Sequence, residues 1–294
     1  MSPAGALRLA APPFQQGWQT AGGVIPLDDP VVMGILNLTP DSFSDGGELA
    51  GVDDALRRGD RMLGAGAGIL DVGGESTRPG ASEVPIDEEI RRVVPVIEAL
   101  VRELGAVVSI DTRKSAVAKA ALEAGAVIVN DVSGGAFDPA IRGVVARAGA
   151  GYVIMHMRGT PETMRAHAGY GDIGSEVRDE LLEAAERAIE AGVRREAIVL
   201  DPGIGFAKDA RGSLTLLARL ELLALEGFPL LVGLSRKSFL GEVLGVPAGE
   251  RVTGSAVAAA LARERGAHLF RVHDVEPTVQ ALAVVEALAR AGEA

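Results

Sequence analysis

The sequence of 294 residues contains no cysteine, which excludes disulfide bonds, thiolate metal sites and cysteine nucleophiles. Aromatic residues make up only 3% of the chain, so Ala, Val, Leu and Ile must fill the core. No uninterrupted apolar run reaches the roughly 20 residues of a transmembrane helix. The first residues lack the basic start and apolar stretch of a secretory signal peptide. We therefore expect a cytoplasmic protein without a membrane partner.

Positive charge is also scarce, since the formal net charge is -11 at pH 7. A nonspecific nucleic-acid binder needs a basic surface, so we expect no nucleic-acid partner. An anionic small substrate stays compatible with this charge, because a few local cations can dominate a cleft. The chain also has no HExxH zinc pair, Walker A loop or GxSxG nucleophile elbow.

What the chain does contain is a series of eight apolar runs, most of which end in a polar or charged residue before a turn. The runs end near Asn37, Asp71, Asp111, Asn130, His156, Asp201, Ser235 and Arg271. Each interval has room for a helix, so the rhythm predicts eight strand–helix units. In a (β/α)8 barrel, the carboxyl ends of the strands form the rim where active sites lie. The sequence thus predicts an α/β protein with a single (β/α)8 TIM barrel.

The predicted strands are continuous apolar runs, as expected for parallel strands that are buried on both faces. They cover residues 31–36, 69–72, 107–110, 127–129, 152–155, 198–200, 230–234 and 269–272. Apolar residues at helical spacing predict helices over 52–63, 88–104, 115–124, 139–148, 177–191, 213–225, 252–265 and 277–291. We expect residues 1–29 to form an irregular or hairpin-bearing N-terminal extension, and residues 30–294 to form the barrel domain.

The first strand ends in Asn37 and leads into a long polar loop, residues 39–51, that contains Phe43 and Asp45. An amide oxygen at Asn37 can bind a hard cation such as Mg2+. Long loops over a barrel mouth are usually lids or binding loops, and Phe43 favours a lid over a flat ligand. For Asp41 and Asp45, a simple role in turns is an equal alternative.

A second long loop, residues 73–87, contains Arg78, whose planar guanidinium suits phosphate oxygens. A solvated surface arginine is the alternative. Asp71 ends the strand before this loop, and it can instead serve as a structural partner inside the barrel.

Three further strands end in Asp111, Asn130 and Asp201, which converge on one cavity if the barrel is correct. Carboxylates and an amide can pair with the N–H and amino edge of a fused pyrimidine ring. The same side chains can alternatively bind a divalent metal, and the residues alone do not separate the two interpretations.

The last two strands end at the rim where barrels frequently bind phosphate, and they are followed by Lys237 and His273. Lys237 is one of only four lysines beside twenty-five arginines, which favours a need for a compact ammonium. The alternative is that it caps or solvates a helix start. Arg271 and His273 can point to the same side of an extended segment. For His156, a buried structural role is at least as well supported as a catalytic one.

The motifs together resemble those of the dihydropteroate synthase family. The matching segments are ILNLTPDSFSDGG, DVGGESTRPG, SIDT, VNDVSGG, HMRG, LDPGIGFAK, GLSRKSFLG and FRVHDV, which occur in this order over essentially the whole barrel. The resemblance implies condensation of 6-hydroxymethyl-7,8-dihydropterin diphosphate with 4-aminobenzoate to give 7,8-dihydropteroate and diphosphate. It also implies Mg2+ as the cofactor and a homodimer.

The resemblance implies roles for the site residues by their motif positions. The implied pterin and diphosphate ligands are Thr77, Arg78, Asp111, Asn130, Asp201, Lys237, Arg271 and His273. The implied aminobenzoate ligands are Phe43, Pro79, Ser235 and Arg236, and the implied metal ligand is Asn37. We take as catalytic candidates Asp45, Lys237, Arg271 and His273. Two alternatives are the pterin-binding barrel of a corrinoid-dependent methyltransferase and a noncatalytic pterin-binding homologue.

Overall fold

The computed structural model describes residues 17–38, 47–76, 83–224 and 226–292. Its main sheet has eight strands, and all the pairs within it are parallel. The strands are β3 (Val31–Asn37), β4 (Ile69–Gly73), β5 (Val108–Asp111), β6 (Ile128–Asp131), β7 (Gly151–Met155), β8 (Ile198–Asp201), β9 (Leu231–Val232) and β10 (Leu269–Val272). A parallel bridge between Leu200 and Leu230 joins the two edges of the sheet. The predicted TIM barrel is therefore confirmed.

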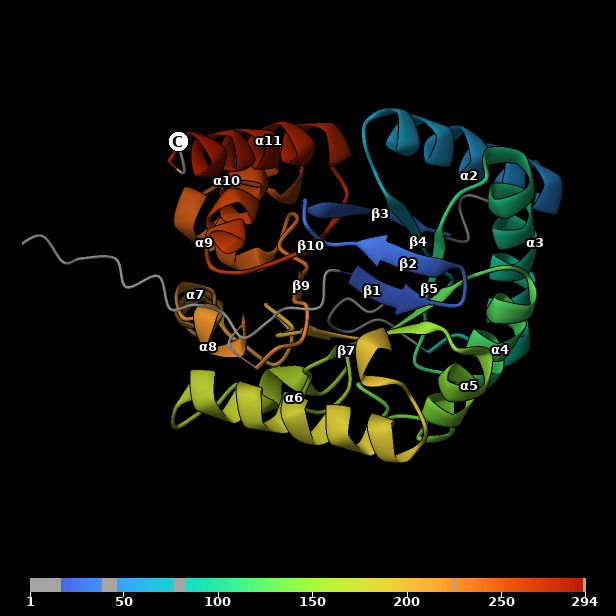
Figure 1. Cartoon of the computed structure of the whole chain (residues 1–294), viewed down its shortest axis with the longest axis horizontal. Coiled ribbons are helices and arrows are strands. Elements are labelled where there is room, and N and C mark those ends of the chain that lie inside the picture. Colours follow the sequence, from blue (N-terminus) through green and yellow to red (C-terminus); the bar gives the residue numbers. More distant parts are fainter. Residues whose placement is uncertain (1–16, 39–46, 77–82, 225, 293–294) are drawn as a thin grey trace, which may run out of the picture.

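Helices surround the sheet as a ring, which Figure 1 shows from one end of the barrel. They are α2 (Gly47–Gly64), α3 (Ile86–Leu104), α4 (Ser115–Glu123), α5 (Ala140–Ala148), α6 (Ile173–Glu190), α7 (Ala210–Ala218), α8 (Glu221–Ala224), α9 (Ser238–Leu244), α10 (Val252–Arg263) and α11 (Val275–Ala291). Short 3-10 turns are η1 (Met164–His167), η2 (Arg195–Ala197) and η3 (Ala248–Glu250). Within the described residues, no helix is both long and apolar enough to cross a membrane. The cytoplasmic location stays a prediction.

Two predicted elements differ from the structure. The helix predicted over 213–225 is divided into α7 and α8, because the backbone of Arg219 (φ -113°, ψ 23°) leaves the helical region. The Arg219 guanidinium turns toward Asp172, the N-cap of α6, at 2.7 Å. The strand predicted over 230–234 is only the two residues of β9, since a turn closed by the Lys237 N–H on the Leu234 carbonyl follows it.

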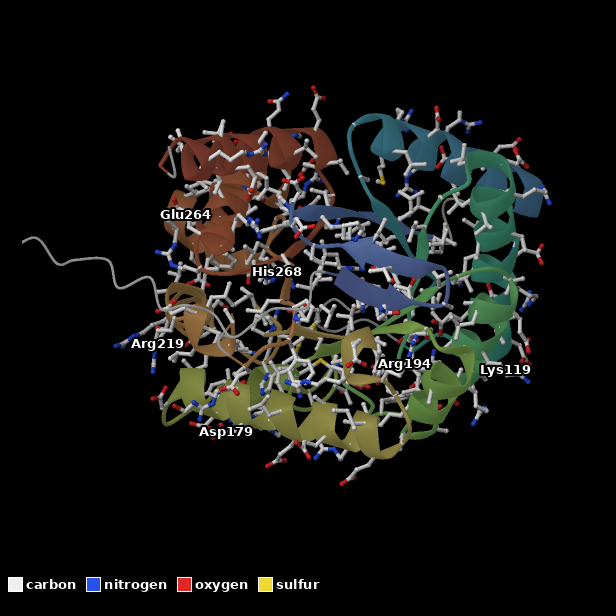
Figure 2. All side chains as sticks on the ribbon, in the orientation of Figure 1. Lys119, Asp179, Arg194, Arg219, Glu264 and His268 are labelled. Carbon is white, nitrogen blue, oxygen red and sulfur yellow. The ribbon has the colours of Figure 1, made fainter. Side chains whose placement is uncertain are left out.

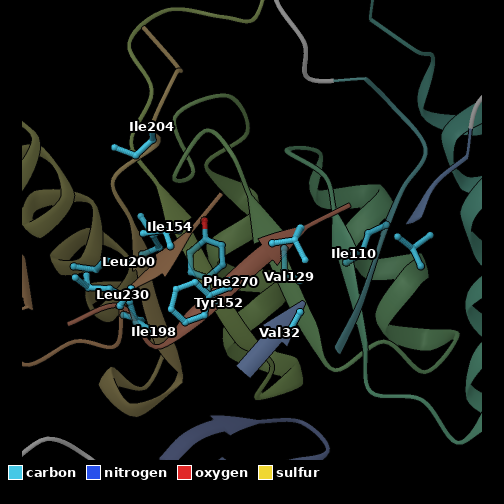
Figure 3. Packing of buried hydrophobic residues seen from close by; sticks show 14 of the residues in the cluster. Val32, Ile110, Val129, Tyr152, Ile154, Ile198, Leu200, Ile204, Leu230 and Phe270 are labelled. Carbon is cyan, nitrogen blue, oxygen red and sulfur yellow. The ribbon is translucent and has the colours of Figure 1, made fainter. Parts of the chain in front are cut away.

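The strands are buried on both faces, as their continuous apolar runs predicted. Outward-facing side chains such as Tyr152, Ile154, Ile198, Leu200 and Phe270 pack together in the layer between the strands and the helices (Figure 3). At the amino ends of the strands, the inward-facing residues form a second buried cluster: Met33, Ile69, Ile128, Val153, Val199, Leu231 and Leu269.

A hairpin closes the amino-terminal mouth of the barrel. Its strands β1 (Gly17–Thr20) and β2 (Gly23–Pro26) lie across the middle of the ring of helices in Figure 1. Trp18 is fully buried in the apolar cluster just described, and its indole N–H donates a hydrogen bond of 2.7 Å to the Ala197 carbonyl. Because this mouth is filled with apolar side chains, a ligand must enter from the opposite mouth.

Candidate active site at the carboxyl ends of the strands

A pocket of about 410 Å³ opens at the carboxyl-terminal mouth of the barrel. Every predicted site residue in the described part of the chain lines it: Asn37, Asp111, Asn130, Asp201, Ser235, Arg236, Lys237, Arg271 and His273. They come from six strand ends. Strand alternation turns those within strands inward, and Ser235, Arg236, Lys237 and His273 follow the ends of β9 and β10. The convergence on one cavity that the strand ends predicted is therefore present.

Predicted site residues in the two long loops lie outside the described residues. These are Phe43, Asp45, Thr77, Arg78 and Pro79. Their roles stay predictions from the resemblance.

Arg271 is the centre of an ionic network at the floor of the pocket. Its Nε donates to Asp71 Oδ2 at 2.6 Å, and its Nη2 donates to Asp111 Oδ2 at 2.5 Å. Asn130 Nδ2 donates to the same Asp71 oxygen at 3.0 Å. Asp71 is fully buried and does not line the pocket, so it holds Arg271 and Asn130 in place from below. The structural alternative considered for Asp71 fits this geometry.

The two carboxylates of the pocket have room for hydrogen-bond donors of a ligand. Within the described part of the chain, Oδ1 of Asp111 is buried without a hydrogen-bond partner. Asp201 Oδ1 accepts the Gly203 N–H at 2.7 Å. Burial raises the pKa of Asp111 to about 7 against the opposing charge of Arg271, and burial likewise raises the pKa of Asp201. A ligand that donates a hydrogen bond to Asp111 supplies the partner that its buried oxygen lacks.

Lys237 places an ammonium on the wall of the pocket. It precedes α9 as its N-cap residue, and its side chain makes no capping hydrogen bond. Its Nζ lies 4.0 Å from the centroid of the Phe206 ring. Burial lowers the pKa of Lys237 to about 8, and the negative charge of Asp201 opposes this shift.

Ser235, Arg236 and His273 also line the pocket. Ser235 Oγ lies 3.1 Å from His273 Nδ1, and it accepts the His273 backbone N–H at 3.2 Å. Arg236 is held by both oxygens of Asp274, at 2.9 and 2.6 Å. Its backbone has a left-handed φ of 58°, an uncommon conformation for a residue with a Cβ.

His156 is a structural histidine. It is 4% exposed, and it does not line the pocket. Nε2 lies 3.0 Å from Glu180 Oε2, and Nδ1 lies 2.9 Å from Lys208 Nζ. Burial lowers the pKa of His156 to about 4, so the ring is neutral at physiological pH.

Two buried lysines were missed by the sequence analysis. Lys208 contacts His156, and Lys114 joins Glu75 and Glu89 at 2.6 and 2.8 Å. Both side chains are almost fully buried. The scarcity of lysine, which drew attention to Lys237, was a signal that applied equally to these two residues.

Comparisons with known proteins identify the family. A model of pterin binding enzymes matches residues 33–273. Dihydropteroate synthase of Escherichia coli K12 is 45% identical over 92% of this chain and 96% of its own length. The Synechocystis dihydropteroate synthase is 49% identical over 88% of this chain and 90% of its own length.

The chain belongs to the dihydropteroate synthase family. Solved structures agree: the Burkholderia cenocepacia dihydropteroate synthase, complexed with 7,8-dihydropteroate, has a TM-score of 0.86 at 45% identity and covers 95% of this chain and 99% of its own. The Xanthomonas albilineans enzyme with 4-aminobenzoic acid has a TM-score of 0.86 at 44% identity, over 93% of this chain and 98% of its own. The family, function and transferase class predicted from the sequence are confirmed.

Proposed function

We propose that the pocket at the carboxyl-terminal mouth condenses 6-hydroxymethyl-7,8-dihydropterin diphosphate with 4-aminobenzoate, giving 7,8-dihydropteroate and diphosphate. The observation that carries this proposal is the meeting of Asp111, Asn130 and Asp201 with Lys237 and Arg271 in one cavity. Relatives of the same fold bind the product and one substrate, as the Burkholderia and Xanthomonas complexes are described.

The pterin ring fits the acidic side of this pocket. A pterin edge presents an N–H and an amino group, and the buried carboxylates of Asp111 and Asp201 are suited to accept them. Asn130 offers an amide whose orientation is fixed by Asp71 at 3.0 Å. Lys237 offers a donor to the ring acceptors. The burial of these groups makes each of the resulting hydrogen bonds selective, because an unsuitable ligand leaves a buried charge unpaired.

The cationic side of the pocket suits the diphosphate. Arg271 and His273 supply positive or hydrogen-bonding groups that stabilise the charge of the leaving diphosphate. As the carbon–oxygen bond breaks, positive charge forms on the pterin methylene and spreads into the ring. The carboxylates of Asp111 and Asp201 stabilise that cation, and the amine of 4-aminobenzoate then attacks the methylene and loses a proton. This path needs no protein nucleophile.

The proposal includes Mg2+ bound to the diphosphate. The described residues contain no cluster of three or more His, Asp or Glu that could hold a metal. They do place the amide of Asn37 on the pocket wall, and Mg2+ commonly takes one or two protein oxygens, with substrate phosphate and water completing its shell. The residues therefore fit a metal that arrives with the substrate, where it would neutralise charge on the leaving group.

Removal of Mg2+ tests this part of the proposal. We expect a chelator to abolish turnover and added Mg2+ to restore it, while the unfolding midpoint stays unchanged. We also expect Asn37→Ala to raise the Mg2+ concentration needed for half-maximal rate. Full activity in the chelator would remove Mg2+ from the mechanism.

The proposal also includes a homodimer formed through α9, α10 and α11, which lie side by side in Figure 1. These helices expose large apolar side chains: Val243, Leu244, Val257, Leu261, Val284 and Leu288. Burial of such an apolar surface against a second copy of the chain stabilises the dimer. Sedimentation should give twice the 30.3 kDa chain mass, and Val257→Glu should shift it toward one chain mass. Val24→Glu is a matched control, since Val24 is 55% exposed on the hairpin and Val257 is 54% exposed.

The experiment that tests the catalytic proposal is one incubation with both substrates and Mg2+, read by mass spectrometry. We expect a product with the mass of 7,8-dihydropteroate that is absent when 4-aminobenzoate is omitted. Calorimetric binding of the pterin without any product would instead indicate a noncatalytic pterin-binding protein.

A further inference from the structure

Lysine is rare in this chain, and its environment differs sharply between Lys119 and Lys208. There are four lysines and twenty-five arginines. Lys119 is the ordinary surface case: its side chain is 65% exposed on α4, and Figure 2 shows it on the outer surface. Lys208 differs, because it is 7% exposed and its hydrogen-bond partners in the described part of the chain include no carboxylate. A buried ammonium in such a place requires another explanation.

The Lys208 ammonium is surrounded by uncharged acceptors from two segments. It donates to the carbonyl oxygen of Phe206 at 2.9 Å and to that of Gly203 at 3.1 Å. It also lies 2.9 Å from Nδ1 of His156 and 3.4 Å from the carbonyl oxygen of the same residue. Burial lowers the pKa of Lys208 to about 7. In the protonated form its Nζ has only donors, so Nδ1 accepts and Nε2–H of His156 donates to Glu180 at 3.0 Å. The side chain thus ties the end of β7 to the segment after β8.

The segment after β8, residues 202–207, has an unfavourable backbone conformation that hydrogen bonds can stabilise. Gly203 has a φ of 65°, and a Cβ at that position would overlap the His156 carbonyl oxygen. Ala207 has a φ of 48°, a left-handed conformation that costs free energy in a residue with a Cβ. The hydrogen bonds from Lys208 offset this cost and hold the two carbonyls toward one point.

The same segment forms one wall of the pocket, through Gly203, Ile204, Gly205 and Phe206. The Phe206 ring lies 4.0 Å from Lys237 Nζ. A Cβ on Gly205 would lie 3.3 Å from Lys237 Cδ, so the backbone there packs against the lysine stem. The position of Lys237 in the pocket therefore depends on the conformation of residues 202–207.

We propose that Lys208 is a positioning residue for the pterin half of the reaction: its ammonium gathers the Gly203 and Phe206 carbonyls and the His156 ring, and thereby places Phe206 against Lys237. An arginine would not replace it, because a planar guanidinium cannot direct three donors to one compact cluster of acceptors. This inference rests on the proposed function for its kinetic consequence, but its structural part stands without it.

The experiment compares the whole chain with Lys208→Met, Lys208→Arg and, as the matched control, Lys119→Met. Hydrogen exchange read by mass spectrometry over residues 202–207 measures how firmly the segment is held. Steady-state kinetics give KM for the pterin diphosphate, KM for 4-aminobenzoate and kcat. For both Lys208 variants, we expect exchange in this segment at least about tenfold faster and the pterin KM raised about tenfold, with the aminobenzoate KM changed less than twofold. Lys119→Met should match the parent chain in every measurement.

A double-mutant cycle with Phe206→Leu completes the test. If Lys208 acts through this segment, the two substitutions together raise the pterin KM little more than the larger single effect. Unchanged exchange, equal losses for both substrates, recovery by Lys208→Arg, or additive effects in the cycle would each overturn the proposal. If Lys208→Met fails to fold, Lys208→Arg carries the same comparison. A parent chain that makes no dihydropteroate would contradict the proposed function, while the exchange measurement would still decide the role of Lys208.

Discussion

The two mouths of the barrel are built from the same strands in opposite ways. At the amino-terminal mouth, Trp18 of the hairpin is buried in a wholly apolar cluster. At the carboxyl-terminal mouth, Arg271 joins Asp71 and Asp111 through bonds of 2.6 and 2.5 Å, and Asp111 retains an unpaired oxygen within the described part of the chain. The amino-terminal mouth is closed by apolar side chains, whereas the carboxyl-terminal mouth is open and contains charged groups that can pair with a ligand.

A step of two residues along a strand separates these environments. Side chains two positions apart face the same side of a strand. One residue of each pair therefore lies in the apolar cluster at the amino-terminal mouth, and the residue two positions later reaches the pocket. The pairs are Ile128 and Asn130, Val199 and Asp201, and Leu269 and Arg271. Stability and chemistry therefore depend on separate layers of one interior, and substitutions should change one without the other.

The largest effect is expected at the open mouth, from Arg271→Met. The change removes a charge that stabilises the leaving group, so kcat/KM should fall about 100- to 1,000-fold. It also leaves Asp71 and Asp111 buried without their partner, which should lower the free energy of unfolding by about 3–5 kcal/mol. Steady-state kinetics and urea unfolding check both values. Arg57→Met, on an arginine 64% exposed, is the control and should change neither.

At the closed mouth, Trp18→Ala should affect stability alone. Loss of a fully buried indole should reduce the free energy of unfolding by about 3–5 kcal/mol. We expect kcat/KM to change less than twofold at a temperature where the variant is folded, because Trp18 and its apolar cluster lie at the other end of the barrel from the pocket. A large loss of kcat/KM in the folded variant would show that the two mouths are coupled.

Asp201→Asn should affect binding with little change in stability. The amide keeps an oxygen that can accept the Gly203 N–H, but it removes the negative charge that faces the pterin edge. We expect pterin affinity to weaken by about 1–3 kcal/mol, the range for a hydrogen bond to a charged group. Titration calorimetry measures it, and an unchanged affinity would remove Asp201 from the pterin site.

The smallest effect concerns pH. The pKa of Asp111 is raised to about 7, so acid protonates it and removes an acceptor for the pterin. The pKa of Lys237 is lowered to about 8, so alkali removes its ammonium. We therefore expect kcat/KM for the pterin diphosphate to be greatest between about pH 7 and 8 and to fall on both sides. A rate profile that is flat from pH 6 to 9 would contradict these assignments.

The sequence predicted the open mouth better than the closed one. Asp111, Asn130 and Asp201 could be placed because each ends an apolar run, and parallel strands bring their carboxyl ends to one rim. Trp18 could not be placed, because a short hairpin in a Pro- and Gly-rich segment carries no sign of what it packs against. The strands other than β9 were found nearly to the residue, while α9 and the break at Arg219 were missed.

Lys208 shows a further limit of sequence reasoning. Its partners are backbone carbonyls and a histidine fifty-two positions away, and carbonyl groups leave no pattern in a sequence. Only its residue type, rare in this chain, was informative. Positioning residues of this kind become visible once the backbone they hold is known.

The most direct test of the division between the two mouths is a crystal structure with 6-hydroxymethylpterin bound. We expect the ring inside the carboxyl-terminal pocket, with its N–H and amino edge on Asp111 and Asp201 and with Lys237 beside the ring. A pterin bound anywhere else on the barrel, with this pocket empty, would contradict it.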